Sequence, residues 1–184
     1  MSKSDFDAFV KRQQAGEKED QAFNTKQQLD EWLGYLNSLY KQITSYLQTY
    51  INDGAAQITY RDISINEEFI GVYTTQEMIL RFGRSTVTFL PIGTMLIGMK
   101  GRVDVQGPVG TARLALINKR VTTARQLIQV TITSPGSPPL NSPPPEVIRQ
   151  IEWTWKISTP PPEMKFIELT QGAFLDMILA VADA

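Results

Sequence analysis

The spacing of apolar residues changes at Gly54, and this change decides the fold class. Before Gly54, seven apolar residues follow one another at intervals of four and three, which is typical of a helix with one buried face. After Gly54, apolar and polar residues alternate in short segments, as they do in half-buried strands. We therefore expect a single domain in which residues 1–54 are helical and residues 55–184 form a sheet with a C-terminal helix.

Two helices are expected in the N-terminal part. A short amphipathic helix begins near Ser4, whose hydroxyl is a suitable cap. The polar segment 14–20 (QAGEKED) is interpreted as a break. A long helix then runs from about Asp20 to Asn52 and ends at Gly54, a residue type common just after helix ends.

The long helix carries a heptad-like seam, and two interpretations of it are open. The seam either packs on the protein's own sheet or first helix, or it joins two copies of the chain in a coiled coil. A helix of about thirty residues is long for so small a domain, and for this reason we expect a homodimer. The seam residues are Leu29, Leu33, Leu36, Tyr40, Ile43 and Leu47.

The alternating segments after Gly54 are joined by short turns, which is typical of an antiparallel meander. The expected fold is α+β, with N-terminal helices (one of them long), an antiparallel β-meander of six to eight strands and a short C-terminal helix capped by Thr170. The predicted strands are 57–65, 68–73, 77–82, 85–90, 95–105, 111–117, 125–133 and 147–158, with a further strand at 163–169.

The segment 134–147 (SPGSPPLNSPPPEV) holds six of the eleven prolines. It lies between two predicted strands, 125–133 and 147–158, whose similar lengths favour pairing with each other. Too few residues follow it for a second domain. A docking peptide is the alternative, but no basic residue stands beside the minimal PxxP of Pro135 and Pro138. We interpret the segment as a long hairpin connection.

The chain contains no cysteine and no histidine. Thiol nucleophiles, zinc–thiolate sites, imidazole bases and Ser-His-Asp triads are therefore excluded. The glycine-rich segment 93–101 (GTMLIGMKG) lacks the spacing of a phosphate-binding loop. A carboxylate-based enzyme is a remaining alternative, but no paired-acid motif supports it, and we predict no catalytic residue, metal site or cofactor. The acids considered are Asp62, Glu67, Glu68, Glu77, Asp104 and Glu152.

Two tryptophans lie on one face of the predicted strand 147–158. Trp153 and Trp155 alternate with polar residues, so they point in the same direction. A face this bulky normally belongs to the core under a packed helix. The alternative is a small-molecule site in an apolar pocket between the curved sheet and the long helix.

The charges are unevenly distributed although the net charge is −1. Residues 81–125 hold eight basic side chains and a single acidic one, whereas the flanking regions are acidic. Strand alternation predicts that five basic residues gather on one solvent-facing side of the sheet. Pairing with acids on neighbouring strands is the alternative. The five residues are Arg81, Lys100, Arg102, Arg113 and Arg125.

These patterns favour a non-enzymatic binding or interaction protein that presents its basic sheet face to an anionic partner. An acidic protein surface is the expected partner, since no aromatic residue interleaves the basic positions as nucleic-acid binding usually requires. The N-terminus lacks the apolar region of a secretory signal, and no segment reaches the length of a membrane span. A cytoplasmic location without membrane contact is therefore expected.

Overall fold

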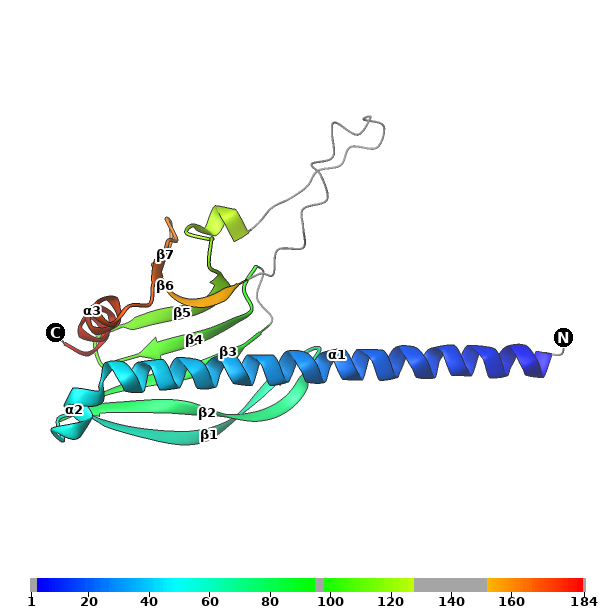
Figure 1. Ribbon diagram of the computed structural model, residues 1–184, viewed down its shortest axis with the longest axis horizontal. Coiled ribbons are helices and arrows are strands. Elements are labelled where there is room, and N and C mark those ends of the chain that lie inside the picture. Colours follow the sequence, from blue (N-terminus) through cyan, green and yellow to red (C-terminus); the bar gives the residue numbers. More distant parts are fainter. Residues whose placement is uncertain (1–2, 95–97, 128–151, 184) are drawn as a thin grey trace, which may run out of the picture.

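The computed structural model describes residues 3–94, 98–127 and 152–183, with side chains from Asn24 onward. It confirms the α+β class, with a long N-terminal helix, a seven-stranded antiparallel meander and a C-terminal helix (Figure 1). The elements are α1 (Lys3–Tyr46), α2 (Gln48–Asn52), β1 (Gln57–Glu67), β2 (Gly71–Phe82), β3 (Ser85–Gly93), β4 (Gly101–Gln106), β5 (Thr111–Asn118), the 3-10 helix η1 (Ala124–Leu127), β6 (Trp153–Ser158), β7 (Phe166–Glu168) and α3 (Gln171–Ala182).

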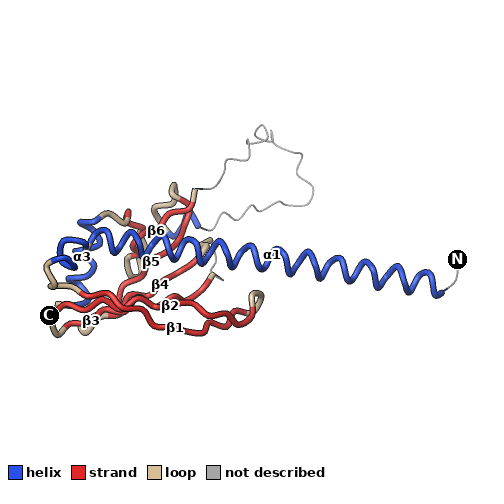
Figure 2. Tube along the Cα trace, turned by 60° about the horizontal axis from the view of Figure 1, so that its bottom comes forward, coloured by secondary structure: helices blue, strands red, loops and turns tan. Residues whose placement is uncertain are grey.

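The strands lie in the sheet in the order in which they occur in the chain, each antiparallel to its neighbours. Short turns join β1 to β2, β2 to β3 and β4 to β5, whereas residues 119–152 connect β5 to β6. In the turn between β4 and β5, the N–H of Gly107 donates to the carbonyl of Gly110 at 2.9 Å. The C-terminal half of α1 covers one face of the sheet, and its N-terminal half projects beyond the ends of the strands (Figures 1 and 2).

The predicted break at residues 14–20 is wrong, because α1 is continuous from Lys3 to Tyr46. Most residues of this segment favour helix, and a single interior glycine costs only about 1 kcal/mol. The helix instead bends at Leu47, after which α2 continues to Asn52. Gly54 has a φ of 72° and ends the helical part, as predicted.

The main core lies between the sheet and the two helices α1 and α3. Both helices cover the same face, since the rings of Tyr46 in α1 and Phe174 in α3 are 5.7 Å apart. Phe174 also stacks on Phe89 of β3. Thr170 caps α3 as predicted, its hydroxyl accepting from the N–H of Ala173 at 3.2 Å.

A smaller core covers the opposite face of the sheet at β5. Ala115, Ile117 and Phe166 are buried there against the segment that follows β5, including Val121 and Leu127. The apolar run from Leu114 to Ile117 in β5 is therefore buried on both faces, as a strand covered on two sides requires.

Burial along β2 changes phase between Glu77 and Met78. Tyr73 and Thr75 are buried before this point, and Leu80 after it. The change falls where β2 leaves β3, which pairs only with residues 78–82. Among the described residues, the rest of β2 pairs with β1 alone, and such two-stranded ribbons twist more strongly than wide sheets. This twist brings the ribbon alongside α1.

Several strand predictions differ from the structure. In segment 95–105, residues 98–100 precede the strand β4, which begins at Gly101. Segments 68–73 and 77–82 belong to a turn and the single strand β2. In segment 125–133, residues up to Leu127 form η1 rather than a strand. The predicted pairing of that segment with 147–158 is also wrong, because β6 has β5 and β7 as its two neighbours.

The proline-rich segment 134–147 lies outside the described residues. In the part of the chain that is described, no helix is long and apolar enough to cross a membrane.

Candidate functional site

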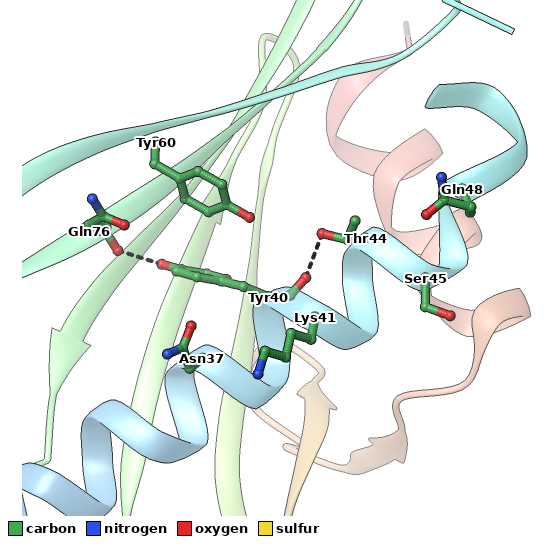
Figure 3. Close-up of a pocket in the computed structure, with 8 residues that line it drawn as sticks. All are labelled: Asn37, Tyr40, Lys41, Thr44, Ser45, Gln48, Tyr60 and Gln76. Atoms are coloured by element: carbon green, nitrogen blue, oxygen red, sulfur yellow. Dashed lines mark hydrogen bonds between the residues drawn. The ribbon is translucent and has the colours of Figure 1, made fainter. Parts of the chain in front are cut away.

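A groove of about 500 Å³ separates α1 from the β1–β2 ribbon (Figure 3). The wall on the α1 side is a stripe of polar residues at helical spacing. Most of them directly follow, in sequence, a residue of the buried stripe formed by Leu36, Tyr40, Ile43 and Leu47. Because the two stripes are adjacent, packing the apolar one on the sheet necessarily turns the polar one toward β1. The polar stripe consists of Asn37, Lys41, Thr44, Ser45 and Gln48.

The floor of the groove is held in place by hydrogen bonds. The Tyr40 hydroxyl donates to the carbonyl of Gln76 at 2.7 Å, and the Thr44 hydroxyl donates to the carbonyl of Tyr40 at 2.8 Å (Figure 3). Tyr60 of β1 meets the Tyr40 ring at a centroid distance of 5.7 Å, and it is 46% exposed. The groove therefore presents an aromatic surface among hydroxyl and amide groups.

One charged side chain lines the groove, and a second is hydrogen-bonded to a residue of the lining. Lys41 is exposed on the helical wall, and among the described residues no acid lies within ion-pair distance of its amine. Asp62 of β1 accepts a hydrogen bond of 2.9 Å from the Gln76 amide, which itself lines the groove. A ligand with both an acidic group and hydrogen-bonding groups suits these surroundings.

Burial raises the pKa of Tyr40 above its ordinary value, and the neighbouring Tyr60 adds to this effect. Burial and the hydrogen bond to Glu67 likewise raise the pKa of Tyr73. A raised pKa in the folded protein gives a stability contribution that is present below about pH 10 and lost as pH rises further.

We therefore expect two phenols to ionise late in a spectrophotometric titration, with unfolding in the same alkaline range. The Tyr40→Phe variant should lose one late-ionising phenol while keeping the other. Loss of neither late component in this variant would contradict the assignment to Tyr40. Tyr50→Phe, at an exposed position in α2, is the matched control.

The six acids named as catalytic candidates do not form one cluster: five of them have different bonding partners, and the sixth is exposed. Glu67 is buried and accepts from the Tyr73 hydroxyl at 2.6 Å and from the N–H and hydroxyl of Thr94, both at 2.8 Å. Glu77 pairs with Arg61 at 2.5 Å. Asp62 bonds Gln76, Asp104 bonds Arg102, Glu152 pairs with Lys119, and Glu68 is exposed at the β1–β2 turn. Among the described residues, no cluster of three acids that could hold a metal ion is found.

The basic residues do not gather as predicted. Lys100 lies on the helical side, where it pairs with Glu31 of α1 and approaches the rings of Tyr35 and Trp153, each at 5.4 Å. The prediction failed because Lys100 precedes β4, so strand alternation does not apply to it. A register shift between Pro91 and Gly93 also disturbs the neighbouring strand.

Three basic residues do share the outer face of the sheet, away from the helices. Arg81, Arg102 and Arg113 are each next to a core residue in their strands, so they point outward. Arg102 is engaged by Asp104 through two hydrogen bonds of 2.8 and 2.9 Å, whereas Arg81 and Arg113 are exposed. Arg125 lies in η1, outside the strands.

The two tryptophans have different surroundings. Trp155 is buried in the core; its indole N–H donates to the carbonyl of Tyr35 at 3.1 Å, and its ring lies 6.0 Å from that of Trp32. Trp153 is half-buried and lines an open depression of about 430 Å³ beside Lys100. The two tryptophans therefore do not form a common apolar pocket.

The predicted dimer seam belongs to the core of a single chain. Leu36, Tyr40, Ile43 and Leu47 are buried against the sheet, and Leu29 and Leu33 are partly buried against the same core. The prediction of a coiled coil through this seam is therefore wrong, and the alternative of packing on the protein's own sheet is confirmed.

The sequence does not predict the groove, although one of its walls can be recognised in the sequence of α1. Polar residues at 37, 41, 44 and 48 repeat the spacing of the seam one position later. Nothing in the sequence indicates that β1 lies beside this stripe, since that depends on the twist of the β1–β2 ribbon. Compared with protein families, with curated proteins and with solved structures, the chain shows no match.

Proposed function

We propose that this chain is a non-enzymatic protein-binding module whose binding site is the groove between α1 and the β1–β2 ribbon. The partner contributes a polar segment with an acidic side chain that pairs with Lys41. The observation that carries the proposal is the exposed Lys41, which has no acidic partner among the described residues and lies beside a hydrogen-bonded floor. The anionic partner expected from the sequence is retained, but its place moves from the outer sheet face to this groove.

A binding role suits the physical character of the groove better than catalysis does. Its lining is made of hydroxyl, amide and phenol groups with one amine, and the acids considered above are held at separate places. Such polar, half-open surfaces are typical of protein interfaces that bind and release their partners. The Tyr40–Tyr60 pair supplies the aromatic contact on which binding energy often concentrates.

The test uses random linear peptides displayed on phage and selected on the wild-type protein, with affinities measured by fluorescence anisotropy. Reversing the charge in Lys41→Glu should weaken the selected peptides by about tenfold, or about 1.4 kcal/mol. Lys26→Glu on the same helix, at an exposed position outside the groove, is the matched control and should leave the affinity within about twofold.

Arg113→Glu on the outer face separates the proposal from the original expectation. If the exposed basic face is the binding site, this variant loses affinity and Lys41→Glu does not. Failure to select any peptide, or binding that is insensitive to Lys41, would contradict the groove as the site.

A further inference from the structure

The two edge strands of the sheet differ in length and in how far other segments cover them. At one edge, β7 has only three residues, and the N–H of Phe166 already donates to the carbonyl of Thr122 at 2.9 Å. A bridge between Thr123 and Lys165 extends this cover. At the other edge, β1 has eleven residues, and within the described part of the chain it pairs with β2 alone. The long edge is therefore open and the short one is covered.

An open edge strand offers a row of backbone donors and acceptors. Every second residue of β1 directs its N–H and C=O away from β2. Proteins usually block long edges with charges or a covering segment, because free edges pair with other chains. The three charged residues of β1 are engaged with β2 instead: Arg61 pairs with Glu77, Asp62 accepts from Gln76, and Glu67 accepts from the Tyr73 hydroxyl.

The open edge and the groove belong to one surface. Tyr60 belongs to β1 and also lines the groove. A strand added outside β1 would direct alternate side chains toward the α1 wall, since successive side chains of a strand point to opposite faces. An edge strand beside a helical wall is the arrangement in which extended peptides bind by strand addition.

We propose that the partner segment binds as an eighth strand, antiparallel or parallel to β1, with alternate side chains in the groove and an acidic one near Lys41. This inference rests on the proposed function and specifies its mode of binding. A second copy of the chain fits the edge less well. Symmetric antiparallel pairing at the middle of β1 would set Arg61 or Asp62 against its own copy, and opposed like charges are unfavourable.

The experiment tests the backbone of the ligand and leaves the protein unchanged. The tightest peptide selected from the phage library is synthesised as a series, each member N-methylated at one position. Strand addition predicts an alternating pattern: methylation at every second residue weakens binding by about tenfold or more, and methylation between them by less than about threefold. Hydrogen exchange should show new protection at alternate amides of β1 in the complex.

The outcomes separate this inference from the proposed function. Uniform or absent sensitivity to N-methylation, while Lys41→Glu still weakens binding, would overturn strand addition and leave the groove as the site. If no selected peptide depends on Lys41, both proposals fail together. A dimer in solution that the peptide dissociates would identify a second copy as the natural occupant and overturn the assignment to a partner protein.

Discussion

Replacing Trp32 by alanine is expected to lower the free energy of unfolding by about 3–5 kcal/mol, the range for removing a fully buried tryptophan. Its side chain is 0% exposed, and among the described side chains of α1 it is the first that is fully buried. The indole lies directly over Gly101, where an added Cβ would approach its Cζ3 to 2.1 Å. Because this contact fixes α1 on the sheet, its loss should loosen the groove as well.

The measurement is urea denaturation of the variants followed by circular dichroism. Leu179→Ala, at a position that is 59% exposed, is the control and should change the free energy of unfolding by less than about 0.5 kcal/mol. Gly101→Ala should cost about 1–3 kcal/mol in the wild-type background through overpacking.

A double-mutant cycle tests whether the two residues act through one contact. In the Trp32→Ala background the space above residue 101 is free, so Gly101→Ala should cost much less there than in the wild type. Additive effects, or a Trp32→Ala cost below about 1 kcal/mol, would show that this contact does not hold α1 in place.

The main elements of the fold could be predicted from the sequence because they depend on local periodicity. The 3-4 spacing of Leu36, Tyr40, Ile43 and Leu47 predicts a helix with one buried face, and the structure buries that face. The two-residue period after Gly54 predicts the meander. The break expected at residues 14–20 is wrong because polar residues do not interrupt a helix when their intrinsic propensities favour it.

The surroundings of individual side chains could not be predicted in the same way. Lys100 was assigned to the outer face by alternation, but it stands before β4 and pairs with Glu31 of α1. The groove depends on how β1 and β2 twist after leaving β3, which no pattern in either strand records. The geometry of the site therefore depends on contacts between residues distant in sequence, whereas the helices and strands depend on residues close in sequence.

Lys156 is the clearest case of a side chain whose surroundings depend on distant residues. It alternates with Trp155 in β6 and therefore lies on the outer face of the sheet, where lysines are usually solvated. The structure shows it 1% exposed beneath the segment that follows β5. Its amine donates to the carbonyls of Lys119 and Val121 at 2.8 and 3.1 Å, and it pairs with Glu168 at 2.9 Å.

Lys156→Ala is expected to lower the free energy of unfolding by about 2–5 kcal/mol, the range for truncating a long, fully buried side chain. The two carbonyls lose their donor, and a void opens beneath the segment. Lys156→Met fills most of that void, so its cost should be smaller, about 1–3 kcal/mol from the unpaired carbonyls. Glu168→Gln should cost less than about 1 kcal/mol, because the Glu168 side chain is 60% exposed.

Lys156→Ala should therefore cost most, Lys156→Met less and Glu168→Gln least. This order is expected if Lys156 acts by binding backbone carbonyls and not only as an ion-pair partner. Lys165→Ala, at an exposed position beside Glu163, is the control. Hydrogen exchange should locate the loss of protection in Lys156→Ala at residues 119–127, since the amine binds carbonyls within that segment. If Glu168→Gln costs as much as Lys156→Ala, the ion pair is the dominant contact and the carbonyl bonds are secondary.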